Sequence, residues 1–324
     1  MSRFFKDANY GRIGVQGTPF RGTGKIFIVG DSSTVNLSML RELWTPDQDG
    51  AVRYFATIDA AVGACTADAG DIIYVMPGHT ETISAAGSLA LDVAGISVIG
   101  IGNGSNRPVL NYTTAAAASV TVGAANILVE NCRFTAGFAD ITVAVDVGTA
   151  AEFTLRNCEF TEPTTDQNFL IGVRTNATAN SADGLRIENC RYIVTDVLDT
   201  NFVYFRNNCA RPTIINNWIK MGVNDSETII RVNTGNSLTD QLITNNFVRR
   251  LQTTSEYITD DVDGIFVGGN TQTNTGIIAL NYVQHSDITT AVLVSLGGVG
   301  MFENYGVQNT TANGILRPLA AGNG

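Results

Sequence analysis

The chain has 324 residues and a formal net charge of −10, with 44% hydrophobic and 15% charged residues. This hydrophobic content excludes a disordered protein. The acidic balance argues against a nucleic-acid partner, because binding to phosphates relies on Lys and Arg. No uncharged apolar run reaches the length of a membrane span, so we expect no membrane contact. The abundance of Gly, Thr, Asn and Val favours strands and turns over long helices.

Residues 1–25 hold too few periodic apolar positions to fold alone, and we expect them to form an extended N-terminal arm. Five of the chain's 20 basic residues lie here, together with four aromatic residues that a purely solvated tail would not need. We interpret the arm as a segment that docks on an acidic or assembled partner, with a disordered tail as the alternative. The residues expected to dock are Phe4, Phe5, Tyr10, Arg12, Phe20 and Arg21.

Residues 26–88 are interpreted as a small N-terminal α/β cap of strands and short helices. Buried strands are expected at residues 25–29 and 72–76, and Thr57 is a plausible N-cap of an Ala-rich helix. The first strand of a stack would otherwise pair with other chains, so a helix that covers this end is expected.

From residue 89 to residue 307 one short pattern recurs at steps of roughly 25 to 35 residues, a period typical of stacked or radial repeats. Each unit has apolar residues at i and i+2, then Asn, then Cys or Asn, then an aromatic or β-branched residue. The apolar period of two predicts a strand on each side of the Asn. Asn tolerates the left-handed backbone conformation that suits a sharp bend.

The repeat predicts an all-β protein, a right-handed parallel β-helix whose equivalent residues stack at a spacing of about 4.8 Å. A leucine-rich repeat does not fit, because the units have little Leu and no helical segment between them; a propeller does not fit, because blade signatures are missing. The ladder positions expected along the stack are Asn131, Asn157, Asn189, Asn216 and Asn245, with Cys132, Cys158 and Cys190. Residues 308–324 are expected to form a C-terminal tail.

The five cysteines are an odd number and lack the spacing of a metal site. Three of them recur at the same place in successive units, which is typical of small buried hydrophobic residues. We expect free thiols and no bound metal, in keeping with assembly in a reducing cytoplasm. The first residues of the chain contain no apolar stretch typical of a secretory signal.

An aromatic stripe is expected on the outside of the coils. Trp218 directly precedes the buried ladder position Ile219, so its side chain should face outward, and Phe247 and Tyr282 hold equivalent places on later coils. Such a stripe on a soluble solenoid typically marks an interface. We interpret these three residues as a contact between copies of the chain; a sugar-binding face is the alternative.

No set of catalytic residues stands out, and we predict that the chain is not an enzyme. The strongest candidate is the acidic loop at residues 256–263, whose carboxylates could serve glycoside hydrolysis or, with Ca²⁺, a lyase; a solvated loop is the simpler interpretation. Asp146, Asp196 and Asp199 form a second acidic set on different coils. His79 and His285 lie far apart in the sequence and are expected in turns or bends, not as a metal pair.

Two segments resemble the opening of pectin-lyase-like right-handed β-helix proteins, and the likeness extends over roughly residues 50–307. They are Thr57-Ile58-Asp59-Ala60-Ala61 with Gly70-Asp71-Ile72-Ile73-Tyr74-Val75 and Pro77-Gly78-His79, followed by Ile96-Ser97-Val98-Ile99-Gly100-Ile101-Gly102. Within this group the chain is most similar to phage virion proteins of the tailspike and head-decoration types. The resemblance implies a homotrimer of β-helices packed side by side around a threefold axis. It implies fold more than activity, because the group contains lyases, hydrolases and structural proteins.

We therefore predict a non-enzymatic phage structural protein, a trimeric capsid decoration (cement) protein that docks on the head shell and stabilises it after assembly in the host cytoplasm. The expected partners are other copies of the chain and the major capsid protein, with no cofactor, nucleic acid or membrane. The alternative is a tailspike-type protein that binds or cleaves host polysaccharide through the β-helix face.

Overall fold

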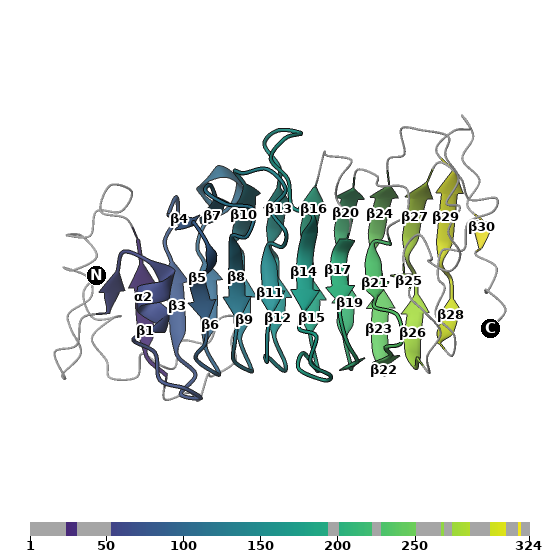
Figure 1. Cartoon of the computed structure of the whole chain (residues 1–324), viewed down its shortest axis with the longest axis horizontal. Coiled ribbons are helices and arrows are strands. Elements are labelled where there is room, and N and C mark those ends of the chain that lie inside the picture. The colour runs from purple at the N-terminus through teal and green to yellow at the C-terminus, as the bar shows by residue number, and fades with distance from the viewer. Residues whose placement is uncertain are drawn as a thin grey trace, which may run out of the picture.

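The computed structural model describes residues 24–30, 53–193, 201–221, 228–250, 267–268, 274–285, 299–308 and 317–318. Over these residues the chain is a right-handed parallel β-helix in which three long sheets run along one elongated stack (Figure 1). The six residues expected to dock on a partner all lie outside the described residues.

We call the three long sheets A, B and C, and the strands of each follow one another in space along the stack. Sheet A contains β2 (Tyr54–Phe55), β1 (Ile26–Val29), β3 (Ile72–Val75), β6 (Ser97–Gly100), β9 (Leu128–Glu130), β12 (Thr154–Arg156), β15 (Arg186–Glu188), β19 (Thr213–Ile215), β23 (Gln241–Thr244), β26 (Gly276–Ala279) and β28 (Gly300–Phe302). Sheet B contains β4 (Thr80–Ile83), β7 (Val109–Tyr112), β10 (Arg133–Ala136), β13 (Glu159–Thr161), β16 (Arg191–Ile193), β20 (Trp218–Met221), β24 (Phe247–Arg250), β27 (Tyr282–His285), β29 (Tyr305–Gln308) and β30 (Arg317–Pro318). Sheet C contains β5 (Ala86–Leu91), β8 (Ser119–Val122), β11 (Val145–Val147), β14 (Ile171–Thr175), β17 (Asn201–Phe205), β21 (Ile230–Val232) and β25 (Val267–Gly268). A separate short pair joins β18 (Cys209–Ala210) to β22 (Leu238–Thr239).

From the coil of β3, β4 and β5 to the coil of β23, β24 and β25, each coil contributes one strand to each sheet in chain order. Among the described residues the last two coils contribute strands to sheets A and B only. The strands pair in parallel with their neighbours, except that β30 runs antiparallel to β29. A 3₁₀ helix, η3 (Gly104–Asn106), lies between β6 and β7. At the N-terminal end the short helix α2 (Ile58–Val62) begins at Thr57, whose side chain accepts a hydrogen bond from the Ala60 amide, as expected of an N-cap.

A two-residue turn joins sheet A to sheet B on each coil from β9 onward, and we call this edge of the stack the Asn corner. The first residue of every turn has a φ between 50° and 58°, the left-handed conformation that Asn tolerates well. These first residues are Asn131, Asn157, Asn189, Asn216, Asn245, Leu280 and Glu303. The repeated Asn therefore sets the bend that the sequence predicts.

The second residue of each turn is buried and points into the stack. It is Cys132, Cys158 and Cys190 on the earlier coils and Asn217, Asn246, Asn281 and Asn304 on the later ones. The four Asn side chains form a hydrogen-bonded ladder in which each amide nitrogen donates to the carbonyl oxygen of the next, at 2.9–3.0 Å. Asn216 and Asn245, which the sequence predicts as ladder positions, are the first residues of their turns. They are exposed and directly precede the buried Asn217 and Asn246.

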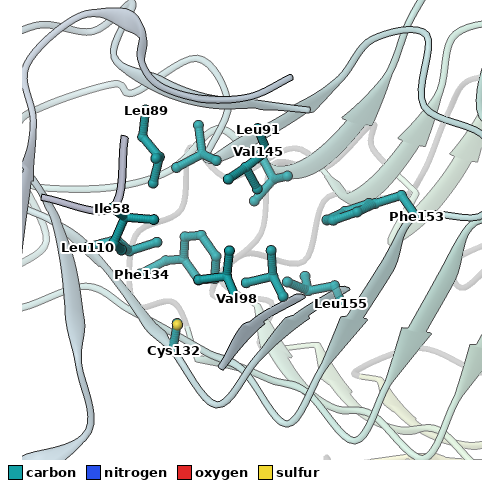
Figure 2. A pocket seen from close by; sticks show the side chains of 12 residues that line it. Ile58, Leu89, Leu91, Val98, Leu110, Cys132, Phe134, Val145, Phe153 and Leu155 are labelled. Carbon is teal, nitrogen blue, oxygen red and sulfur yellow. The ribbon is translucent and has the colours of Figure 1, made fainter. Parts of the chain in front are cut away.

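The interior is filled by apolar side chains stacked at coil spacing. The Phe134 and Phe160 rings are parallel within 12° with centroids 4.7 Å apart, and Tyr192 continues the stack 5.4 Å beyond Phe160. Near the N-terminal end a small gap is lined by aliphatic and aromatic side chains and the Cys132 thiol (Figure 2). A water molecule there would lack hydrogen-bond partners, so the gap is part of the core and not a ligand site.

Candidate functional site

Four aromatic residues occupy equivalent outward positions on successive strands of sheet B, and we call them the aromatic ladder. They are Trp218, Phe247, Tyr282 and Tyr305. The Trp218 and Phe247 rings stack within 4° of parallel at a centroid distance of 6.4 Å, and those of Tyr282 and Tyr305 within 15° at 5.4 Å. Phe247 and Tyr282 are 43% and 41% exposed. The predicted stripe is thus an outward row of rings, and Tyr305 extends it by one coil.

Charged residues replace the aromatic ladder at the same outward position on the three preceding strands of sheet B. The Arg191 guanidinium lies 5.2 Å from the centre of the Trp218 ring and 3.3 Å from a carboxylate oxygen of Glu159. The second oxygen of Glu159 lies 3.1 Å from Arg133 and 3.6 Å from Arg107. Glu159 is nearly buried, and these three cations compensate its charge.

Sheet A shows the same change from charged to apolar residues on the other side of the Asn corner. Arg156 donates to Glu130 at 2.7 Å, and this hydrogen bond raises the pKa of the Arg156 guanidinium. Glu188 on the next coil accepts hydrogen bonds from Arg186. On the later coils the exposed side chains of sheet A include Leu242, Ile277 and Phe302.

Exposed apolar residues gather on the later coils. Of the seven large hydrophobic residues exposed in the described part of the chain, five lie between residues 242 and 302. They are Leu242 and Ile277 on sheet A, Phe302 at the end of β28, and Phe247 and Tyr282 on sheet B, and we call them the apolar patch. In Figure 1 these strands form the green to yellow part of the stack. An exposed apolar surface on two faces that share one edge is typical of an interface.

The candidate carboxylates lie elsewhere. Asp146, on the outer face of sheet C, makes two hydrogen bonds of 2.7 and 3.2 Å with Arg174, and the Arg231 guanidinium lies 5.2 Å from the Tyr204 ring on the same sheet. Asp196, Asp199 and the acidic loop at 256–263 lie outside the described residues. Of the proposed acidic sets, the structure therefore places only Asp146, in an ion pair.

His79 is buried in the first coil, where its Nε2 lies 2.9 Å from Glu81. The same carboxylate oxygen accepts a hydrogen bond from the Ile58 amide at 2.9 Å, so the pair holds the start of α2 against β4. The side chain of His285, in β27, lies outside the described residues. Among described residues no three His, Cys, Asp or Glu side chains are placed to hold a metal ion. None of the helices in the described part of the chain is long and apolar enough to cross a membrane.

All five cysteines are free thiols, and four of them are buried. Burial raises the pKa of Cys65 and of Cys209 to about 12, and that of Cys132 and Cys190 well above its ordinary value. Because the thiolate is the reactive form, we expect almost no labelling of the folded protein by a thiol reagent at pH 8. Unfolding in guanidinium should expose five reactive thiols, counted by absorbance. Rapid labelling of the folded chain would contradict the buried positions.

No protein-family model and no curated protein matches the chain. Among solved structures, the chain is similar to a pectin methylesterase mutant in complex with a hexasaccharide. The match has 10% sequence identity and a TM-score of 0.35, and it covers 90% of this chain and 85% of that one. The parallel β-helix is established by the strand pairing of the chain itself, and a likeness of this size says nothing about function.

The prediction that the chain is not an enzyme is corrected by this comparison. The solved structure with the same fold belongs to an enzyme, so the fold gives no ground for excluding catalysis.

Proposed function

We propose that the chain is a structural protein of a phage virion, a homotrimer that docks on the major capsid protein and stabilises the head shell. The observation that carries the proposal is the aromatic ladder with the adjoining apolar patch. Phe247 and Tyr282 are about two-fifths exposed, and each stacks on a neighbouring ring of the aromatic ladder. With the exposed aliphatic residues on the next face, they form a surface more apolar than that of an ordinary soluble protein. Aromatic residues are also enriched at contacts between subunits.

The sequence of the N-terminal arm supports docking on a shell. Its basic and aromatic residues would supply charge-assisted and apolar contacts to an acidic assembled surface. The resemblance of the coils to phage virion proteins supports the same role.

Disrupting the aromatic ladder is expected to dissociate the trimer. The double variant F247K/Y282K places two cations where rings would be buried between copies, and burying unpaired charge is costly. Sedimentation should report a single-chain mass for this variant and three times that mass for the parent. The matched control is F138K, because Phe138 is 37% exposed but lies outside the apolar patch. Equal masses for F138K and F247K/Y282K would contradict the assignment.

The docking step is tested by mixing the purified protein with phage heads assembled without it. We expect uptake at a fixed ratio to shell subunits and loss of uptake when residues 1–25 are removed. Failure of the intact trimer to bind heads would refute the decoration role.

A tailspike-type role is the second candidate, and the stacked rings beside Arg191 favour it, because aromatic faces and cations together could hold an acidic polysaccharide. Incubation with host surface polysaccharide tests this role. Retention of the polysaccharide, or release of oligosaccharides from it, that is abolished in W218A would replace the decoration role with this one.

A further inference from the structure

The two faces that meet at the Asn corner carry complementary residues coil by coil. On three successive coils the residue before the turn and the residue after it have opposite charges. These pairs are Glu130 with Arg133, Arg156 with Glu159, and Glu188 with Arg191. On the next four coils both positions are uncharged, and the second is always aromatic: Ile215 with Trp218, Thr244 with Phe247, Ala279 with Tyr282, and Phe302 with Tyr305.

Pairing within each sheet explains only part of this pattern. Along sheet A the charges alternate so that Arg156 bonds Glu130, and along sheet B they alternate so that Arg133 and Arg191 bond Glu159. Each alternation would be equally satisfied whichever charge came first. The two sheets are also opposite in sign on every charged coil, which neither alternation requires. A partner that contacts both faces would be complementary to this arrangement.

From this feature we propose that three copies pack in parallel with their Asn corners toward the threefold axis, the sheet A face of one copy lying against the sheet B face of the next. The proposal rests on the trimer of the proposed function and specifies its contact. A closed ring of three uses two different surfaces of each chain, and in this chain they are the two faces beside the corner. The partner that fits each face is therefore a second copy of this chain.

The symmetry also fixes the register. Rotation about a threefold axis involves no shift along the stack, so each coil meets the same coil of its neighbour. Glu130 then faces Arg133 of the next copy, Arg156 faces Glu159, and Glu188 faces Arg191. A shift of one coil would instead set Glu130 against Glu159 and Arg156 against Arg191, which are like charges.

The two halves of the contact have different roles. The exposed side chains of the apolar patch and aromatic ladder supply the buried area that holds the copies together. The charged side chains are already paired within their own sheets, and the Arg191 side chain is 55% exposed, so they contribute little affinity and mainly select the register.

Site-directed cross-linking tests the register. One chain carries Glu188→Cys and a second carries Arg191→Cys; the two are co-expressed and oxidised with copper phenanthroline in air. We expect a disulfide-linked pair of chains from the mixture and none from either variant alone, because the two positions lie on different faces. The matched control combines Arg156→Cys with Arg191→Cys, which lie one coil apart and should not link.

Charge reversal tests the same contact without cysteines. One variant combines E130R, R156E and E188R. It keeps the alternation of charge along sheet A but sets like charges against sheet B of the neighbouring copy. The trimer should therefore be lost at concentrations where the parent is trimeric. Adding R133E, E159R and R191E to the same chain should restore it. Any cost within sheet A is common to both variants. The second variant also loses the Arg107–Glu159 pair within sheet B, so a trimer restored in spite of that loss is restored by the contact between copies.

The outcomes are distinguishable. The in-register link together with restoration of the trimer supports the proposal. A trimer that links one coil out of register, links identical positions, or is indifferent to the reversal overturns the proposed contact while the trimer stands. A parent chain that sediments as a monomer overturns the trimer itself.

Discussion

Phe160→Ala is expected to lower the free energy of unfolding by about 3–5 kcal/mol, the range for truncating a buried aromatic ring. The Phe160 side chain is fully buried between the Phe134 ring on the preceding coil and Tyr192 on the following one. Two further rings, those of Phe169 and Phe202, meet it edge-on at 6.3 and 6.4 Å. The strand ladders hold the coils at fixed spacing, so the cavity left by the ring cannot collapse.

Urea denaturation followed by circular dichroism measures this loss. The matched control is Phe138→Ala, because an exposed Phe outside the core should change stability by no more than about 0.5 kcal/mol. Similar midpoints for the two variants would show that the interior stack does not hold the coils together.

Asn246→Ala is expected to cost at least about 3 kcal/mol, because one truncation leaves several buried polar groups without partners. The Asn246 side-chain oxygen accepts hydrogen bonds from the backbone and side-chain nitrogens of Asn217, both at 3.0 Å. Its amide nitrogen donates to the Ile214 carbonyl and to the Asn281 side chain, both at 2.9 Å. All of these groups lie inside the Asn corner, where water does not replace the lost bonds.

The neighbouring Asn245 provides the control for this position. It is exposed with a φ of 56°, so Asn245→Gly keeps the turn and should change stability by less than about 1 kcal/mol. Hydrogen exchange of the Asn217 backbone amide, which loses its acceptor when the Asn246 side chain is removed, locates the effect. Faster exchange should appear in the Asn246 variant and not in the Asn245 variant; equal exchange in both would refute the ladder as a stabilising element.

The coil itself could be predicted from the sequence, because its signal is local. A left-handed residue is needed at every bend, and Asn meets this need at five of the seven turns. The period-two pattern on each side then determines which side chains enter the core, including Phe134, Phe160 and Tyr192.

The position of the hydrogen-bonded ladder could not be predicted from the Asn-Asn pairs alone, since both residues are polar. A signal was nevertheless present: Leu280 and Glu303 replace Asn at the first position, whereas Asn281 and Asn304 retain it at the second. The residue kept on these coils is the one with buried hydrogen bonds.

The outward position of the aromatic ladder could be predicted from the same period-two pattern. The ion pairs of Glu159 could not. Arg133 and Arg191 share its register on neighbouring strands, whereas Arg107 lies just before β7, and no sequence spacing brings it to this carboxylate. The His79–Glu81 pair was missed for a similar reason, because its partner amide, that of Ile58, comes from the start of α2.

The most direct test of the central idea, that the faces beside the Asn corner join copies of this chain, is sedimentation equilibrium of the intact protein over a range of concentrations. A mass three times that of the chain, reduced to one in F247K/Y282K, is the predicted result. A single-chain mass for the parent at every concentration would contradict it.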